Sequence, residues 1–120
     1  MAGLLYPKNP GKKKRRKHHP KSIMHPKDGT CYLCIALHGD YRRHPVVQEH
    51  HVFGGPNREL SEEYGLKVYL DLDHHLTGPE AVHRNAETAD FLHREGQRAF
   101  ERVHGSREQF VKIFGRNWMD

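Results

Sequence analysis

The spacing of apolar residues divides this chain into strand-like and helix-like stretches. The runs "VVQEHHVF" (46–53) and "LKVYL" (66–70) are rich in β-branched and aromatic residues, so each predicts a short strand. Between them, "GGPNRELSEEYG" is rich in turn formers and is too long for a tight hairpin turn. The next run, "DHH" (73–75), opens a predicted helix that "TGPE" interrupts or distorts.

The last third of the chain predicts two helices. Apolar and small residues recur at helical spacing between positions 89 and 103, and a glycine ends the pattern. The following run, "SREQFVKIFG", begins with a capping box formed by Ser106 and Gln109. Both helices are expected to pack on the core, and their histidines His93 and His104 are expected to be exposed and not to bind metal. The fold class that follows is α+β.

Positive charge is concentrated at the N-terminus. Residues 1–28 carry nine Lys/Arg and one Asp, a net charge of +8, whereas residues 29–120 carry eleven Lys/Arg and fourteen Asp/Glu, a net charge of −3. The first 28 residues, with four prolines, predict a disordered tail, and residues 29–120 predict one folded domain. The tail is expected to bind phosphates by releasing counterions, or else only to aid solubility. Its basic run consists of Lys12, Lys13, Lys14, Arg15, Arg16 and Lys17.

The two cysteines, Cys31 and Cys34, have C-x-x-C spacing. No apolar run is long enough to span a membrane and no signal peptide is recognisable, so we expect an intracellular protein. In a reducing compartment this spacing favours a metal knuckle or a redox pair, and no βαβ pattern supports the redox pair. Asp71 and His74 repeat the same spacing. We therefore predict a structural Zn²⁺ site formed by Cys31, Cys34, Asp71 and His74.

Histidines occur in two adjacent pairs, His50–His51 and His74–His75, with His83 eight residues beyond the second pair. Neighbouring side chains on a strand point to opposite faces, so one member of the first pair can bind an ion while the other acts as a base. His75 and His83 are placed to face the ion held by His50. Such an ion keeps room for a scissile phosphate, and His51, as a histidine, is a candidate to deprotonate an attacking water. The alternative is that pairs arise by chance among twelve histidines.

Together these motifs resemble the HNH endonucleases of the ββα-metal type. The resemblance runs from about Cys31 to Trp118 and is carried by C-x-x-C, "EHHVFGG", "YGLKVYL" and "DLDHHLTGPEAVH". In addition, "GGPNRELSEEYGL" and "FGRNW" are similar to small HNH-like proteins of bacteriophages and prophages. The resemblance implies a ββα-metal core with a zinc knuckle, covered by the two C-terminal helices. It also implies a phage- or prophage-encoded protein that acts in the bacterial cytoplasm.

The resemblance assigns roles to the histidines as well. In HNH enzymes the first histidine of the doublet binds the catalytic metal and the second is the general base, which implies His50 as ligand and His51 as base. His75 and His83 match the other ligands. The catalytic ion is then expected to be Mg²⁺, Mn²⁺, Ni²⁺ or Zn²⁺.

The sequence departs from the family pattern at two places. Asp71 and His74 stand where zinc-bearing relatives have a second C-x-x-C. Tyr64 and Gly65 stand near the position of the family's central asparagine, and Asn57 is the nearest asparagine upstream. The spacing between the last two ligands is also longer than a single helical turn.

The expected function is metal-dependent hydrolysis of DNA phosphodiester bonds. Arg58 or Arg84 is expected to hold the DNA backbone, and a surface salt bridge is the alternative for either arginine. The competing function is a non-catalytic, zinc-stabilised nucleic-acid-binding protein of phage origin, which the missing asparagine favours and His51 opposes. DNA is the expected partner in both cases, no membrane contact is expected, and the oligomeric state is open.

Overall fold

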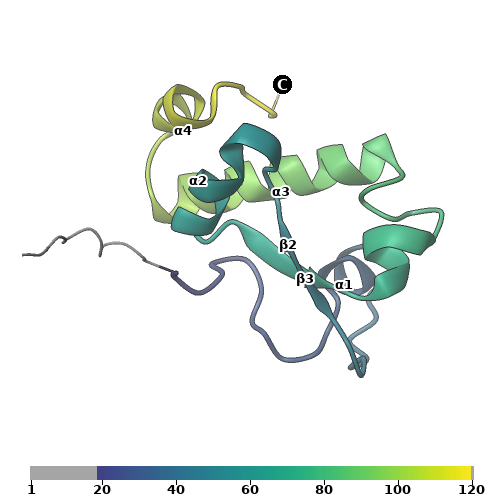
Figure 1. Ribbon diagram of the computed structural model, residues 1–120. Coiled ribbons are helices and arrows are strands. Elements are labelled where there is room, and N and C mark those ends of the chain that lie inside the picture. Colours follow the sequence, from purple (N-terminus) through teal and green to yellow (C-terminus); the bar gives the residue numbers. More distant parts are fainter. Residues whose placement is uncertain (1–18, 120) are drawn as a thin grey trace, which may run out of the picture.

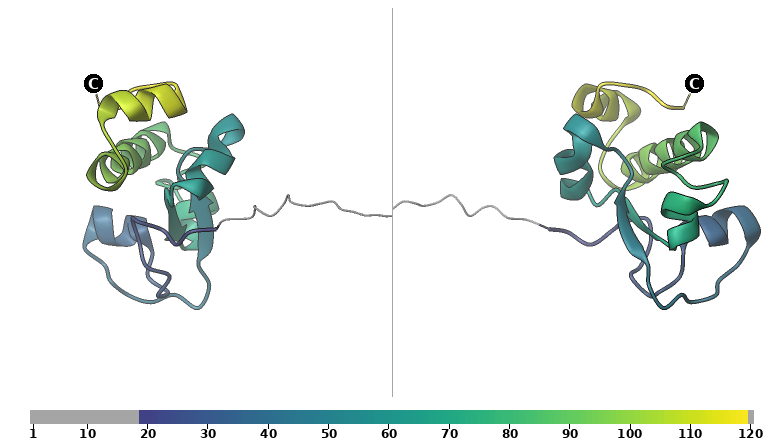
Figure 2. Two further views of the ribbon diagram at one scale, coloured as in Figure 1. Left: turned by 90° about the vertical axis from the view of Figure 1, so that its left-hand side faces the viewer. Right: turned by 45° about the vertical axis from the view of Figure 1, so that its right-hand side comes forward.

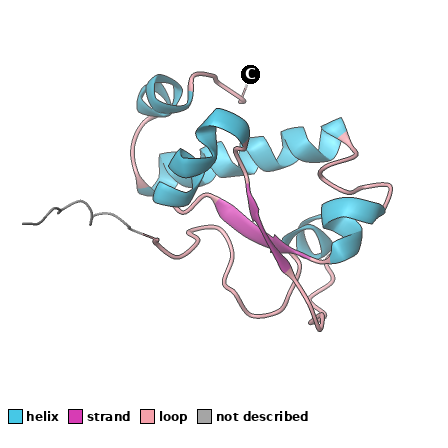
Figure 3. Ribbon diagram, in the orientation of Figure 1, coloured by secondary structure: helices cyan, strands magenta, loops and turns pink. Residues whose placement is uncertain are grey.

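The computed structural model describes residues 19–119, so the basic run of residues 12–17 lies outside the described part of the chain. Figure 1 and Figure 3 show an α+β fold, as predicted, in which helices surround one pair of strands. In chain order the elements are α1 (Tyr32–His38), β2 (Gln48–His51), η2 (Gly55–Asn57), α2 (Arg58–Glu63), β3 (Lys67–Leu70), η3 (Asp73–Thr77), α3 (Ala86–Val103) and α4 (Arg107–Phe114).

The two predicted strands pair with each other. β2 and β3 form an antiparallel sheet in which His50 lies opposite Val68 and His51 lies opposite Lys67. Figure 2 shows α1 and α3 on one side of the strands and α2 on the other. All four residues of β3 are buried, whereas β2 is only partly buried. β2 can therefore present polar side chains at the surface while β3 supports them from the core.

The segment between the strands is helical, which its turn-forming composition did not predict. Residues 55–57 form a 3-10 turn that contains Pro56, and α2 follows directly. Ser61 is fully buried, and its hydroxyl donates a hydrogen bond to the Leu66 carbonyl. This bond ties the end of α2 to the start of β3, so the connection is a rigid element and not an open loop.

Part of the predicted tail belongs to the folded body, which corrects the boundary at residue 28. Ile23 donates its backbone N–H to the Gly65 carbonyl over 2.9 Å. Gly65 has a φ of +71°, and a Cβ there would lie 2.7 Å from the Lys21 carbonyl oxygen. His25 is buried, and its ring accepts the Tyr69 backbone N–H over 3.1 Å. This segment covers the second edge of β3. Its few inward-facing residues make the contacts that hold it there, although lysines lie between them.

The helix expected at "DHH" is a single π-helical turn, η3. It ends at Gly78, where a Cβ would lie 2.6 Å from Oδ1 of Asp73. The chain returns so closely on itself that a longer regular helix cannot continue there. After a short irregular stretch, Asn85 caps α3 by accepting the Thr88 backbone N–H over 3.1 Å.

The two C-terminal helices were predicted correctly. Ser106 and Gln109 form the predicted capping box at the start of α4. Within α3, Gly96 lies where the helix passes the end of β2, and a Cβ there would lie 2.8 Å from Cγ1 of Val52. The absence of a side chain therefore lets α3 approach the strand pair. Within residues 19–119, no helix is both long and apolar enough to cross a membrane.

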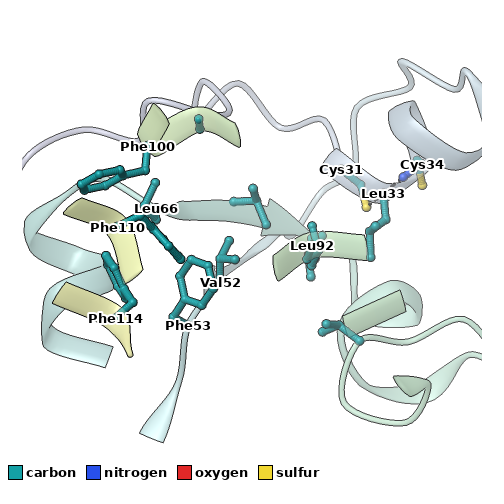
Figure 4. Packing of buried hydrophobic residues seen from close by; sticks show 14 residues of the cluster. Cys31, Leu33, Cys34, Val52, Phe53, Leu66, Leu92, Phe100, Phe110 and Phe114 are labelled. Carbon is teal, nitrogen blue, oxygen red and sulfur yellow. Dashed lines mark hydrogen bonds between the residues drawn. The ribbon is translucent and has the colours of Figure 1, made fainter. Parts of the chain in front are cut away.

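The core has an aromatic end and a cysteine end, which Figure 4 shows together. At the aromatic end, the ring centroid of Phe110 lies 5.3 Å from that of Phe100 and 4.6 Å from that of Phe114. At the other end, Cys31 is fully buried near Leu92. The aromatic end fixes the C-terminal helices by burying apolar area, whereas the opposite end places two thiols inside the protein.

Candidate metal centres

The four side chains predicted as zinc ligands lie together. Cys31 caps the N-terminus of α1, and Cys34 lies in the first turn of that helix. Asp71 follows β3, and His74 belongs to η3. The ligand atoms of all four residues lie within 4.8 Å of one another. One helix start therefore supplies the two thiols that Figure 4 shows, and the turn after β3 supplies a carboxylate and an imidazole.

The distances within this cluster suit a tetrahedral zinc ion. Nδ1 of His74 lies 3.7 Å from Sγ of Cys31 and 3.4 Å from Sγ of Cys34. Oδ2 of Asp71 lies 3.5 Å from Sγ of Cys34. Zinc bonds of about 2.0–2.3 Å arranged as a tetrahedron separate their ligand atoms by roughly 3.3–3.8 Å. Since both thiols are buried, this geometry favours a metal site over a redox pair, which needs an accessible thiol.

The charges in this cluster favour a bound cation. Burial, together with the neighbouring Cys31 and Asp71, raises the pKa of the Cys34 thiol. Burial also acts to raise the pKa of Asp71, but the His74 backbone N–H and ring outweigh it and the pKa is lowered. An ionised carboxylate thus faces the Cys34 thiol, which resists ionisation on its own. A divalent cation stabilises both thiolates and the carboxylate at once.

His44 joins the cysteine cluster and was not predicted. Its Nε2 atom lies 3.8 Å from Sγ of Cys34 and 3.7 Å from Oδ2 of Asp71. The loop after α1 brings it there, because the His44 backbone N–H donates to the Gly29 carbonyl over 2.9 Å. His44 is not among the four residues whose ligand atoms converge, so it lies beside the ligand set, in contact with Cys34 and Asp71. No periodicity of the sequence encodes this loop contact.

The second ring nitrogen of His74 also faces a carboxylate. Nε2 of His74 lies 3.6 Å from Oε1 of Glu80, and Nε2 of His38 lies 2.9 Å from the same oxygen. A carboxylate behind a metal-binding imidazole fixes the tautomer and makes the ligating nitrogen more basic. Glu80 therefore supports Nδ1 as the atom of His74 that faces the cysteines.

The three histidines predicted as catalytic ligands form a second cluster. The ligand atoms of His50 in β2, His75 in η3 and His83 before α3 lie within 4.8 Å of one another. Nε2 of His75 and Nε2 of His83 are 3.1 Å apart. Nδ1 of His75 lies 2.7 Å from Oε1 of Gln48, an acceptor that holds the proton on that nitrogen. In this tautomer Nε2 of His75 carries no proton, so its lone pair can bind an ion.

Burial and neighbouring histidines favour the neutral forms of His50 and His75. Burial, followed by the neighbouring His75 and His83, lowers the pKa of His50 to about 3. Burial and His83 lower the pKa of His75 as well. Neutral imidazoles are the form that binds metals. Three imidazoles suit Zn²⁺ or Ni²⁺ better than Mg²⁺, which prefers oxygen ligands, so the donor set narrows the ions expected from the sequence.

His51, the predicted general base, has a different partner from His50. Its Nε2 atom lies 2.7 Å from Oε1 of Glu62 in α2, and its side chain is 11% exposed. Glu62 also accepts a hydrogen bond from Nζ of Lys67 over 3.0 Å and lies 2.9 Å from Nδ1 of His19. The carboxylate therefore occupies one ring nitrogen of His51 and leaves Nδ1 available.

Glu62 is ionised within this network. Burial acts to raise its pKa, but its hydrogen-bond partners, first among them His51, lower that pKa to about 2. Burial likewise opposes the charge of Lys67, but pairing with Glu62 outweighs burial and raises the Lys67 pKa. Sequence reasoning missed Glu62 because the segment between the strands was expected to be a loop. Its one signal was an acidic residue shortly before a predicted strand.

The cluster of His50, His75 and His83 borders one hollow together with His51. This hollow has a volume of about 420 Å³. The side chains along it that bear on function are His50, His51, His75, His83, His93 and Arg58. Arg58 is exposed and has no ion pair within residues 19–119. Arg84, by contrast, donates from Nη1 to the Thr77 carbonyl over 2.8 Å and so caps η3. The structure therefore places Arg58 at the hollow and uses Arg84 to hold the turn that carries His75.

His93 belongs to this hollow, which corrects the prediction that it is exposed. Its ring stacks on Phe53 with centroids 5.3 Å apart and lies 4.1 Å from the ring of Trp118. Burial outweighs the attraction of Asp90 and lowers the His93 pKa. The helical pattern could not show this, because the contact depends on how closely α3 approaches β2. His104 is exposed at the end of α3, as predicted.

The two clusters lie on either side of one π-helical turn. His74 faces Cys31 and Cys34, whereas its neighbour His75 faces His50 and His83. Comparisons of the chain with protein-family models, with curated proteins and with solved structures find no match. The function is therefore inferred from the chemistry of the two clusters.

Proposed function

We propose that the protein is a metal-dependent endonuclease that hydrolyses DNA phosphodiester bonds at a ββα-metal type centre. One observation carries the proposal: three histidines converge beside His51, a fourth histidine that a carboxylate holds, and all four border the same hollow. The catalytic ion is assigned to His50, His75 and His83. The structural zinc is assigned to Cys31, Cys34, Asp71 and His74.

The chain supplies a base beside the ion site. A bound divalent ion polarises the phosphate and offsets the charge that develops on the leaving oxygen. Nδ1 of His51 accepts a proton from water while the water oxygen bonds to phosphorus and the bond to the leaving oxygen breaks. The leaving oxygen then takes up a proton from solvent, giving one phosphomonoester and one hydroxyl end. Glu62, held ionised by Lys67, stabilises the imidazolium that forms on His51.

Substrate contacts are assigned to Arg58, which has no ion pair within residues 19–119, and to the basic run near the N-terminus. Arg58 lies at the hollow and can hold a phosphate beside the histidines. The basic run of residues 12–17 adds attraction to the DNA backbone without sequence preference. Arg84 is not assigned to DNA, because it holds the Thr77 carbonyl.

One observation favours the competing function, a non-catalytic zinc-stabilised nucleic-acid-binding protein. Asn57, the nearest asparagine to the place where the HNH family has one, donates from Nδ2 to the Phe114 carbonyl over 3.1 Å. It therefore joins α2 to α4 and does not support the histidines. A protein of this second kind would need the cysteine cluster but not His51.

A nicking assay on supercoiled plasmid separates the two functions. The full-length chain is assayed with added Zn²⁺, Ni²⁺, Mn²⁺ or Mg²⁺, beside His51→Ala and a matched control, His104→Ala, at an exposed position. The endonuclease proposal expects nicking by the wild type and by His104→Ala and its loss in His51→Ala. DNA binding without nicking by the wild type under all four ions would instead establish the binding module.

A further inference from the structure

The last described residues, which we call the C-terminal segment (residues 116–119), are fixed against α3. The Trp118 backbone N–H donates to Oε1 of Gln97 over 2.7 Å, and Nε2 of Gln97 donates to Oδ1 of Asn117 over 2.8 Å. Gln97 is 0% exposed. Buried polar atoms need partners, and here the partners of a core glutamine come from the segment beyond the last helix. The C-terminal segment is therefore part of the folded body.

This arrangement groups three rings and one guanidinium. The Phe53 and His93 rings stack with centroids 5.3 Å apart, and the Trp118 ring, on which Arg116 lies, is 4.1 Å from that of His93 and 6.4 Å from that of Phe53. The guanidinium carbon of Arg116 lies 3.7 Å from the centre of the Trp118 ring. A guanidinium on an aromatic face is attracted by the ring electrons and loses rotational freedom, while its N–H groups stay directed outward in its plane.

Arg116 carries a charge that no residue in the described part of the chain neutralises. It is exposed and has no ion pair within residues 19–119. Two other arginines of the C-terminal helices differ: Arg98 pairs with Glu95 over 2.6 Å, and Arg107 pairs with Glu101 over 3.0 Å. A cation that is both held in place and unpaired is arranged for an anion from outside the protein.

The position of Arg116 links it to the histidine-lined hollow. His93 borders that hollow, and its ring contacts the Trp118 ring on which Arg116 lies. Arg58 approaches the same hollow from α2. The two unpaired guanidinium groups thus come from different elements, α2 and the C-terminal segment, as expected for a chain of phosphates that passes the hollow.

We propose that Arg116 binds a backbone phosphate of the nucleic acid adjacent to the one at the histidines, so that the C-terminal segment forms part of the substrate site. This inference rests on the proposed function and adds a substrate contact to it. The planar guanidinium can donate two hydrogen bonds to one phosphate while its face stays on Trp118. Since Trp118 contacts both Arg116 and His93, its role here is to position Arg116.

Salt-dependent DNA binding tests this proposal. Binding of a fluorescent duplex is measured by anisotropy over a series of salt concentrations, in a His51→Ala background that prevents turnover. Arg116→Gln is compared with Lys112→Gln, which removes the same charge from an exposed position on α4. Loss of one phosphate contact is expected to weaken binding several-fold at low salt and to reduce the slope of log K against log [salt] by about 0.9. Lys112→Gln should leave the slope within error of the background.

A conservative variant separates phosphate binding from a role in folding. Arg116→Lys keeps the charge and should restore the salt slope while recovering only part of the affinity, because lysine cannot make the paired contact. All variants should keep the thermal unfolding midpoint of the background. Equal slopes for Arg116→Gln and Lys112→Gln overturn the role of Arg116 while leaving the proposed function intact. Absence of DNA binding by the wild type overturns both.

Discussion

Nε2 of His51 and Oε1 of Glu62 lie 2.7 Å apart and join the end of β2 to α2. Because Glu62 is ionised, it accepts the N–H of the neutral ring and so selects the tautomer that has Nδ1 unprotonated. The same carboxylate stabilises the ring once Nδ1 has gained a proton. The basicity and orientation of His51 therefore depend on a residue in another element.

Replacing Glu62 by glutamine should slow DNA cleavage without weakening DNA binding. Glutamine keeps the size of the side chain but loses the charge that stabilises the protonated ring, and changes of this kind cost roughly 10–100-fold in activity. Single-turnover nicking rates and anisotropy measure the two effects separately. Glu63→Gln is the matched control, since Glu63 is exposed and has the same charge. Equal rates for both variants would rule out a positioning role for Glu62.

Alanine variants of the neighbours His50 and His51 are expected to lose different properties. His51→Ala removes the proposed base and should reduce cleavage by roughly 10²–10⁴-fold. Its metal content should stay near the wild-type value, because His51 lies outside the group formed by His50, His75 and His83. His50→Ala should lose bound metal and activity together. Elemental analysis beside nicking rates measures both properties, and equal metal loss in the two variants would contradict this division.

Loss of the structural zinc should destabilise the fold at its cysteine end. Cys34→Ser removes a thiolate that is central to the cluster, so we expect loss of stoichiometric zinc and a lower unfolding midpoint. His44→Ala should keep the zinc with an affinity reduced roughly 10–100-fold, because His44 contacts the ligand Asp71 without being one of the four ligands. Zinc release to a chromophoric chelator and thermal unfolding measure these outcomes. A Cys34→Ser protein with unchanged stability and zinc content would refute the site.

Stability should fall in mild acid because His25 must stay neutral. Its Nδ1 accepts the Tyr69 N–H over 3.1 Å and its Nε2 bonds to Thr30 Oγ1 over 2.9 Å, so a second ring proton has no acceptor. Burial outweighs the attraction of Asp28 and lowers the folded-state pKa below the ordinary value of 6.5. The stabilisation is therefore complete above pH 6.5 and declines as the pH falls through the folded-state pKa.

Urea unfolding at pH 8 and at pH 5 measures this effect. His50, His75 and His93 also have lowered pKa values, so the comparison is between the wild type and His25→Gln, in which this position no longer titrates. The wild type should lose more stability between the two pH values than the variant does. An identical loss in both proteins would show that His25 does not contribute to the acid sensitivity.

The sequence predicted the parts of the fold that depend on local pattern. The strand pair follows from β-branched residues around His50 and Val68, and the last helices follow from periodicity and the Ser106 cap. The grouping of Cys31 with His74 followed from repeated spacing, because each pair lies at the start of a short helical turn.

Features that depend on contacts between distant segments could not be predicted in this way. His44 reaches the cysteines only because its loop folds back on Gly29. Glu62 reaches His51 because a turn-rich segment forms a helix. His93 becomes part of the hollow through the close approach of α3. In each case the local residues are compatible with an exposed position, and tertiary packing decides the outcome.

The adjacency of His74 and His75 in the single turn η3 has a thermodynamic consequence. Each histidine faces a different cluster, so an ion bound at the cysteines restricts the turn that also orients His75. Restricting that turn lowers the conformational entropy lost when the second ion binds. The two sites are therefore expected to show positive cooperativity. Because linkage is reciprocal, the ion at His50, His75 and His83 should strengthen zinc binding at the cysteines by the same factor.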